Sequence, residues 1–208
     1  MPALQIIGIP QSTYVRTSRL TAHEKGAAYD LVVEMPHSPA VLSISPFGKV
    51  PVMRHGDVEL YESKAINTYI DRAFDGPALI PADPAGAARV EQWVSAINTE
   101  MDPLMVRRYL FAYLFPKGED GKPDRAAIDA CLPDLDTQIG RLGKGMGYSD
   151  VFASDALTLA DLTLVPIVYY LKGAPESGEK VAAAKHLSAW VDRMSARDSV
   201  KAKVPPAA

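Results

Sequence analysis

Two segments of the chain combine a hydroxyl side chain with a predicted helix start. Ser12 follows an apolar run over Ala3–Gly8 and stands where the first helix is expected to begin. Ser63 stands at the start of a later helix and is preceded by Glu62. Helix capping is the simplest role for both serines. The N-terminus of a helix also favours an anion, because its first N–H groups have no partner within the helix.

A proline near the start of a predicted strand is the third feature that could support binding. The strand is expected over Val50–Arg54, yet Pro51 has no N–H to give to a sheet. A cis Val50–Pro51 bond costs only ~0.5–1 kcal/mol relative to trans and would turn the backbone N–H and C=O of Val50 outward. An extended peptide could pair with these groups as an added strand. An ordinary loop proline ahead of a strand is the alternative.

The first part of the chain predicts a small α/β domain. The pattern of strand, helix and strand over Ala3–Gly8, Ser12–Lys25 and Tyr29–Glu34 is typical of a βαβ unit with parallel strands. A hairpin then joins Val50–Arg54 to Val58–Tyr61, and a helix follows over Ser63–Phe74.

The second part of the chain shows no strand pattern and predicts a helical domain. Residues 77–84 are punctuated by proline and form a linker between a first domain over residues 1–76 and a second over residues 85–208. The expected helices of the second domain are Ala85–Phe115, Asp124–Leu142, Thr158–Lys172 and Ala182–Met194.

The composition excludes several classes of function. Of the 208 residues, 48% are apolar and 23% are charged, which is ordinary for a globular protein. The net charge is −3 and the sequence contains no block of like charge, which argues against a nucleic-acid partner. The most apolar segment, Ala156–Leu171, is short for a membrane span and is interrupted by Asp161. The single cysteine, Cys131, allows no internal disulfide and favours a reducing compartment. The four histidines lack ligand spacing, so no metal site is expected.

Two motifs, taken together with the spacing between them, resemble the thioredoxin-like half of the cytosolic glutathione S-transferases. These motifs are Ser45–Met53 and Leu60–Ile66. The segment Pro10–Arg16 is similar to the serine-bearing loop of plant phi-type and related bacterial members, and Thr158–Asp161 is similar to the capping box of their helical domain. The resemblance implies a thioredoxin-like βαβ-ββα domain, an all-helical second domain, a cytoplasmic location and a homodimer.

The resemblance also implies which residues bind glutathione. The backbone of Val50, before a cis Pro51, would pair with the cysteinyl residue, and the hydroxyl of Ser12 would donate a hydrogen bond to its sulfur. Ser63 would bind the γ-glutamyl carboxylate and Glu62 the ammonium group. Family members place basic residues against the glycyl end of glutathione. Here these would be Lys49 and His37.

Magnitudes show why a hydroxyl is needed beside the sulfur. A free thiol has a pKa of ~8.5, and lowering it by about two units requires ~2.7 kcal/mol of thiolate stabilisation. A helix terminus supplies about 0.3–1 kcal/mol, and a hydrogen bond to a charged group about 1.5–3 kcal/mol. Ser12 together with the helix could therefore suffice, while Thr13 and Tyr14 remain rivals.

The predicted function is conjugation of the glutathione thiolate to an electrophilic, apolar small molecule, without a metal ion. The family position of the helix over Ala85–Phe115 implies that it lines the pocket for this second substrate. Tyr14, Tyr109 and Tyr113 are the candidate pocket residues. A glutathione-dependent isomerase or peroxidase is the first alternative. A non-catalytic protein of the same fold that binds ligands or other proteins is the second.

Overall fold

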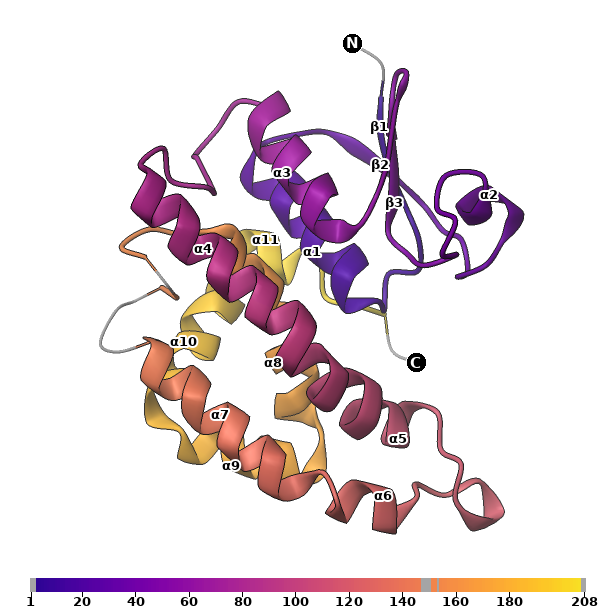
Figure 1. Ribbon diagram of the computed structural model, residues 1–208, viewed down its shortest axis with the longest axis vertical. Helices are drawn as coiled ribbons and strands as arrows, with labels where there is room; N and C mark the ends of the chain where they lie inside the picture. The colour runs from indigo at the N-terminus through magenta and orange to yellow at the C-terminus, as the bar shows by residue number, and fades with distance from the viewer. Residues whose placement is uncertain (1–2, 147–150, 153, 207–208) are drawn as a thin grey trace. The chain divides into compact units, whose positions relative to one another are not determined.

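The computed structural model of the chain describes residues 3–146, 151–152 and 154–206 (Figure 1). Its residues group into two compact units. The first comprises Met1–Pro84 together with Ala196–Ala208, and the second comprises Ala85–Ser195.

A four-stranded mixed sheet forms the centre of the first unit. In spatial order its strands are β2 (Tyr29–Val32), β1 (Leu4–Ile7), β3 (Val52–His55) and β4 (Val58–Tyr61). β1 is parallel to β2 and antiparallel to β3, and β3 is antiparallel to β4. The predicted βαβ unit followed by a hairpin is confirmed, and it has the thioredoxin-like arrangement.

Helices cover both faces of this sheet. Figure 1 shows α1 (Thr13–Glu24) and α3 (Ser63–Ala73) on one face and the short α2 (Pro39–Leu42) on the other. Successive side chains of a strand point to opposite faces. Ile6 therefore joins the core under α1 and α3, whereas its neighbour Ile7 packs with residues of the α2 face.

The predicted start of the third strand is wrong by two residues. We expected the strand to begin at Val50, but β3 begins at Val52. The physical reason is Pro51, which has no N–H and therefore cannot join the ladder of hydrogen bonds.

The described residues of the second unit form helices and no strand. In chain order they are α4 (Pro84–Ala96), the π-helical segments η1 (Ile97–Met101) and η2 (Pro103–Leu110), α5 (Phe111–Leu114), the short 3₁₀ helix η3 (Glu119–Gly121), α6 (Arg125–Asp129), α7 (Leu132–Met146), α8 (Leu159–Gly173), α9 (Pro175–Ala183) and α10 (Lys185–Ala196).

The helices differ from their predicted bounds at three places. The helix expected over residues 85–115 widens into π-helical turns around Pro103, whose ring clashes with the carbonyl four residues earlier. The helix expected over residues 124–142 is divided into α6 and α7 at Cys131. Residues 175–183 form α9, which the sequence pattern did not predict, and α10 then covers residues 185–196.

The last helix, α11 (Asp198–Lys201), packs on α1 and belongs to the first unit, although we expected residues 85–208 to form one helical domain. The carboxylate of Glu24 accepts hydrogen bonds from Arg197, at 3.0 and 2.8 Å, and from the hydroxyl of Ser199. Burial alone would raise the pKa of Glu24, but these donors outweigh it and lower the pKa. This cluster holds the C-terminal segment against the end of α1.

A buried carboxylate fixes the start of α8. Asp161 accepts hydrogen bonds from the backbone N–H groups of Phe152 and Thr158, at 2.6 and 3.0 Å, and from the indole N–H of Trp190 at 3.0 Å. Thr158 and Asp161 form the capping box that the sequence predicted. Burial is the largest influence on the Asp161 carboxyl and raises its pKa in spite of these donors.

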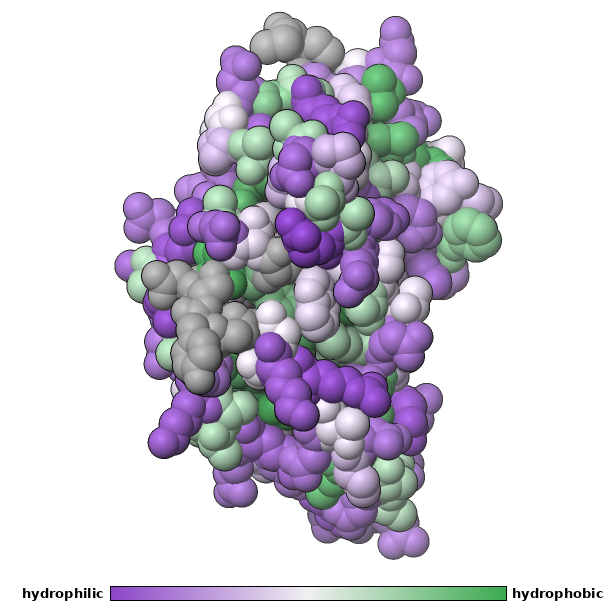
Figure 2. Space-filling view, turned by 60° about the vertical axis from the view of Figure 1, so that its left-hand side comes forward, coloured by the Kyte–Doolittle hydropathy of each residue, from purple (hydrophilic) through white to green (hydrophobic). Residues whose placement is uncertain are grey.

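The surface shown in Figure 2 is mostly hydrophilic, and its apolar residues lie in small separate areas. Among the described residues, no helix has the length and apolar character that crossing a membrane requires.

We predict that Asp161→Asn destabilises the fold by about 2–4 kcal/mol. The new NH₂ group would face buried N–H groups that now donate hydrogen bonds to the carboxylate, and these donors would lose their acceptor. Urea denaturation monitored by circular dichroism measures this difference. Asp155→Asn, which changes an exposed carboxylate nearby, serves as the control and should stay close to the wild type. Equal stabilities of the two variants would contradict the role given to Asp161.

Candidate functional site

Three segments leave the sheet at the same end. Ile7 pairs with Val52, and Val52 pairs with Tyr61. The chain after Ile7 leads to Ser12, while Pro51 directly precedes Val52 and Glu62 directly follows Tyr61. The register of the strands therefore gathers these three regions, in which binding residues were predicted.

Gly8 allows the first two of these segments to approach closely. A Cβ atom on Gly8 would lie 2.7 Å from Cγ2 of Val15 and 2.8 Å from Cβ of Val50. Real Cβ atoms do not approach this closely, so only glycine fits between the first turn of α1 and the loop before β3. Val50 thus lies beside the end of β1 that leads to Ser12.

Ser12 is the N-cap of α1. Its hydroxyl oxygen accepts a long hydrogen bond of 3.4 Å from the N–H of Val15, and the side chain is half-buried. The hydroxyl proton of Ser12 has no acceptor among the described residues. Thr13 is only 6% exposed, so it offers a ligand little surface, whereas Tyr14 is half-buried and keeps part of its surface accessible.

The Val50–Pro51 peptide bond is cis, as the resemblance implied. Pro51 is buried, Val50 is half-buried and Lys49 is exposed. Outside the helices and strands, none of the backbone hydrogen bonds among the described residues uses the N–H or the C=O of Val50.

Glu62, rather than Ser63, is the N-cap residue of α3. Ser63 is the first residue of the helix, and Glu62 has a φ of 66° and makes no side-chain capping bond. The predicted cap at Ser63 is therefore wrong by one position. The difference leaves the N–H of Ser63 among the first, unpaired donors of α3, next to the exposed carboxylate of Glu62.

His37 packs against Gly48, the residue before Lys49. The backbone N–H of His37 donates to the carbonyl of Gly48 at 2.8 Å. The imidazole ring lies over Gly48 so closely that a Cβ there would be 2.1 Å from Nδ1 of His37. The side chains of His37 and Lys49 are both exposed.

The tyrosines predicted to line a second-substrate pocket have different surroundings. Tyr109 is 0% exposed, and its hydroxyl donates to Glu176 at 2.9 Å while it accepts from the N–H of Ser177 at 3.0 Å. Tyr109 is therefore part of the core of the second unit and has no surface to offer a substrate. Tyr113, half-buried, donates to the same carboxylate at 2.6 Å.

Glu176 and Arg125 complete a network that the sequence analysis missed. Arg125 pairs with Glu176 and also with Asp129, at 2.6 Å. Burial raises the pKa of Tyr113 to about 12, with a further contribution from Glu176. Burial alone would also raise the pKa of Glu176, but hydrogen bonds from Tyr113 and Arg125 outweigh it and lower the pKa to about 2. This network joins α5, α6 and α9.

Among the described residues, no group of three or more His, Cys, Asp or Glu side chains could hold a metal ion. The sheet order, the cis proline before β3 and the helix that follows β4 define the first unit as a thioredoxin-like domain, and its polar residues gather where the strands end.

Known proteins share this arrangement. The chain matches the model of the glutathione S-transferase N-terminal domain over residues 6–78 and that of the C-terminal domain over residues 104–198. Glutathione S-transferase F10 of Arabidopsis thaliana is 32% identical over 192 residues, which cover 88% of this chain and 87% of that relative. Glutathione S-transferase 3 of Zea mays is 28% identical over 211 residues, which cover 98% and 94% of the two chains.

Solved structures agree with these relatives. Poplar glutathione transferase F1 is 26% identical, with a TM-score of 0.87 over 98% of this chain and 97% of that chain. Glutathione S-transferase-I, bound with the ligand lactoylglutathione, is 26% identical, with a TM-score of 0.86 over 97% and 98% of the chains. The chain belongs to the glutathione S-transferase family. Its reaction is the transfer of an electrophilic group to the sulfur of glutathione.

We predict that Gly48→Ala destabilises the first unit more than Gly26→Ala does. Both glycines have a φ of +64°, so alanine at either position costs roughly 1–2 kcal/mol of backbone strain. At Gly26 nothing lies within 4 Å of the added Cβ, whereas at Gly48 the methyl group must displace the His37 ring. Urea denaturation measures the free energy of unfolding of both variants. Equal decreases would show that the contact with His37 does not add to the cost of the substitution at Gly48.

We also predict a contribution to stability that depends on pH through Glu176. The folded pKa of about 2 lies below the ordinary value of 4.5, so this contribution is complete above pH 4.5 and is lost as the pH falls through about 2. Its size is about 1–2 kcal/mol, since solvent screens a partly exposed carboxylate. Glu176→Gln should remove it, and Glu179→Gln, an exposed change on the same helix, should not. Denaturation at about pH 5 and about pH 3 tests this; identical pH dependence in the two variants would contradict it.

Proposed function

We propose that glutathione binds along the end of the sheet in the first unit and that Ser12 stabilises its thiolate. The observation that carries this proposal is the row of paired residues Ile7, Val52 and Tyr61, because it brings Ser12, Val50 and Glu62 to the same end of the sheet. The two glycine contacts described above support this arrangement, with Val50 beside α1 and the His37 ring against Gly48, the residue before Lys49.

The backbone of Val50 binds the middle of the tripeptide. Its N–H and C=O are not used by the surrounding loops, so an extended cysteinyl residue can pair with both as a short added strand. Backbone pairing fixes the direction of the tripeptide and leaves its side chains free. The cysteine sulfur can then face the start of α1, which Val50 adjoins through Gly8.

The two ends of glutathione meet groups of opposite charge. The γ-glutamyl end carries an ammonium group, which the exposed carboxylate of Glu62 binds, and a carboxylate, which the N–H and hydroxyl of Ser63 bind at the start of α3. The glycyl carboxylate binds Lys49, which follows Gly48 in the chain, and His37, whose ring packs against Gly48. The site thus offers one acceptor for the single cation of glutathione and donors for both of its anions.

Ser12 supplies the interaction that shifts the sulfur toward its reactive form. Its oxygen is already held by the N–H of Val15, and its proton is free to donate to the thiolate. That hydrogen bond contributes about 1.5–3 kcal/mol, and the α1 terminus adds about 0.3–1 kcal/mol. Together they lower the pKa of the bound thiol by about one to three units, since one unit corresponds to ~1.4 kcal/mol. In the reaction the thiolate forms a C–S bond, and the leaving group departs with the electron pair of the bond that breaks.

The assembly and location of the protein follow its family. We propose a homodimer, supported by the family to which the chain belongs. We also propose a cytoplasmic location, supported by the family and by the single cysteine, Cys131, which is buried and unpaired with another cysteine. The electrophile is an apolar small molecule. Tyr14, which is half-buried and lies two residues after Ser12, is our candidate for contact with it.

We predict that Ser12→Ala lowers kcat by about 10- to 100-fold while the affinity for glutathione stays nearly unchanged, because the lost hydrogen bond is to the charged sulfur. The pKa of the bound thiol, measured by ultraviolet absorbance of the thiolate against pH, should rise by about one to two units. Turnover is followed with a chlorodinitrobenzene-type electrophile.

Two controls separate this role from capping and from binding. Asp124→Ala removes the N-cap of α6, where Asp124 accepts from the N–H of Ala127, and should leave the thiol pKa unchanged. Glu62→Gln should weaken retention on immobilised glutathione without changing the thiol pKa. A thiol pKa in Ser12→Ala equal to that of the wild type would refute the role of Ser12.

A further inference from the structure

Two cationic side chains meet at Tyr29, the first residue of β2, in the first unit. The Nε–H group of Arg19 donates a hydrogen bond to the Tyr29 hydroxyl at 3.1 Å. The ammonium group of Lys203 lies over the Tyr29 ring, 5.2 Å from its centroid. Tyr29 packs on the core under α1 and α3, which holds the ring in place. One tyrosine thus brings together an arginine of α1 and a lysine of the C-terminal segment.

The packing of α11 fixes the backbone of Lys203. Val200 of this helix is buried, and the helix packs on α1 (Figure 1). Arg197, which directly precedes α11, is tied to Glu24 by two hydrogen bonds. The backbone N–H of Lys203 donates to the carbonyl of Val200 at 3.2 Å and closes the turn after the helix. The fold therefore sets Lys203 beside Tyr29, although the two residues are far apart in the sequence.

The hydrogen-bond donors around Tyr29 outnumber the acceptors. The Nη1 atom of Arg19 is buried and has no hydrogen-bond partner. Among the residues that the structure describes, no acceptor takes the hydroxyl proton of Tyr29, and neither Arg19 nor Lys203 forms an ion pair. A buried donor without an acceptor is unfavourable, so an acceptor supplied by a ligand would stabilise this arrangement.

The acidic residues that are near in sequence do not neutralise this cluster. The carboxylate of Glu24 accepts from Arg197 and Ser199. Asp30 follows Tyr29 directly and points to the other face of β2, because successive strand residues alternate. Two positive charges therefore lie at one aromatic ring without a counter-ion from the described part of the chain.

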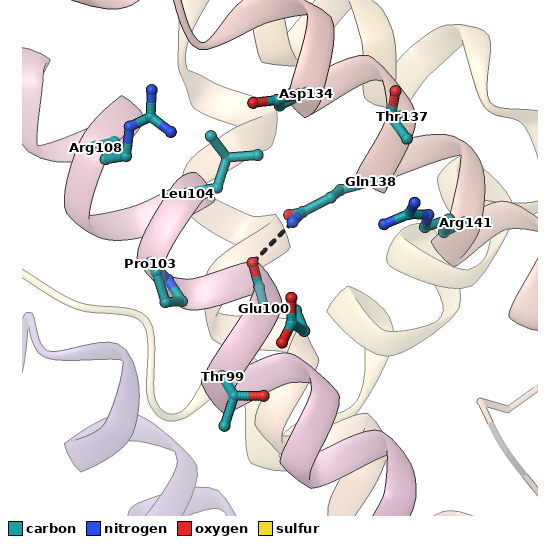
Figure 3. Close-up of a pocket in the computed structure, with 9 residues that line it drawn as sticks. All are labelled: Thr99, Glu100, Pro103, Leu104, Arg108, Asp134, Thr137, Gln138 and Arg141. Atoms are coloured by element: carbon teal, nitrogen blue, oxygen red, sulfur yellow. Dashed lines mark hydrogen bonds between the residues drawn. The ribbon is translucent and has the colours of Figure 1, made fainter.

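The helical unit shows a different arrangement, in which both signs of charge occur together. The surface between η1, η2 and α7 carries Arg108 and Arg141 and also Glu100 and Asp134 (Figure 3). The charges there balance within the chain, whereas those at Tyr29 do not. The net charge of the whole chain is −3, so the excess of positive charge at Tyr29 is a local feature and not part of a generally basic surface.

We propose that Arg19, Tyr29 and Lys203 bind a phosphate group. A phosphate monoester carries a charge of about −1.5 to −2 at neutral pH and three strong acceptor oxygens, which match two cations and a hydroxyl donor. A carboxylate has a single charge and two oxygens. The guanidinium group can donate to two phosphate oxygens at once, and the flexible lysine side chain can turn from the ring toward the same anion. Arg19 and Lys203 are both half-buried, so solvent screens a bound phosphate less than it would at an exposed site.

This phosphate site is separate from the glutathione site. Tyr29 pairs with Leu4, at the start of β1, whereas Ile7 stands at the other end of β1, from which the chain leads to Ser12. The proposal goes beyond the transferase reaction and does not depend on the role of Ser12. The phosphate group can belong to a soluble phosphate ester or to a lipid headgroup, and the two sources can be distinguished by experiment.

Isothermal titration calorimetry of the whole protein with inorganic phosphate, at constant ionic strength, tests the site. The wild type should bind phosphate saturably, and acetate should bind more weakly because it lacks the second charge. Arg19→Gln/Lys203→Gln should weaken phosphate binding by at least about tenfold, because two charge-assisted hydrogen-bonding groups are lost. Tyr29→Phe keeps the ring and loses only a neutral donor, so it should weaken binding by about two- to tenfold. Glutathione should not displace phosphate.

A matched control variant removes the same charge elsewhere. Arg72→Gln/Lys201→Gln changes one exposed residue of α3 and one exposed residue of α11, and it should bind phosphate as the wild type does. Circular dichroism verifies that each variant is folded. Lys203→Gln alone should also weaken binding, and it keeps the test available if the double variant at Arg19 and Lys203 does not fold.

Four results would overturn the proposal. The first is the absence of saturable phosphate binding by the wild type. The second is equal affinity in the control and in Arg19→Gln/Lys203→Gln, and the third is equal affinity for acetate and phosphate. The fourth is displacement of phosphate by glutathione, because the heat would then come from the glutathione site.

Sedimentation with lipid vesicles identifies the source of the phosphate group. If it is a lipid headgroup, vesicles of phosphatidylcholine and phosphatidic acid should carry down the wild type but not Arg19→Gln/Lys203→Gln. If it is a soluble phosphate ester, the wild type should stay in solution with these vesicles and still bind phosphate in the calorimeter.

Discussion

The pairing of Ile7, Val52 and Tyr61 across three strands is the constraint on which the site in the first unit depends. Successive strand residues point to opposite faces, so a slip of one residue would exchange the faces of Val52 and Met53. Met53 is buried in the core under α1 and α3, whereas Val52 is buried on the α2 face. The apolar cores on both faces therefore fix the register, and the register places the three segments that carry the binding residues.

Two helices begin at this end of the sheet, and their N-termini favour the binding of anions there. α1 begins at Thr13 and α3 begins at Ser63, each soon after a strand that ends in the paired row. Each helix terminus stabilises an anion by only about 0.3–1 kcal/mol. A tripeptide with two carboxylates and a thiolate needs more than this, which is why hydroxyl groups and the basic pair His37 and Lys49 add to the effect of the helix ends.

Local pattern was sufficient to predict most of the first unit. The βαβ unit and the hairpin follow from apolar periodicity and turn residues, and the cis bond before Pro51 followed from the family resemblance. Errors arose where one residue decides a boundary. Pro51 delays β3, and the positive φ of Glu62 shifts the cap of α3 by one position. The roles of Gly8 and Gly48 could not be predicted, because they depend on contacts between loops that only the folded chain brings together.

The helical unit was harder to predict because its polar contacts span long stretches of sequence. Tyr109 and Tyr113 are four residues apart, so they lie on one face of their helix and can reach a single acceptor. That acceptor, Glu176, lies 67 residues after Tyr109, and nothing in the spacing of the aromatic residues identifies it. This acceptor explains how Tyr109 can be buried, because a hydroxyl group is found in a core only when it is hydrogen-bonded. Aromatic residues on a predicted helix can therefore be assigned to a pocket only when the hydrogen-bond partners of their polar atoms are known. In this chain those partners assign Tyr109 to the core.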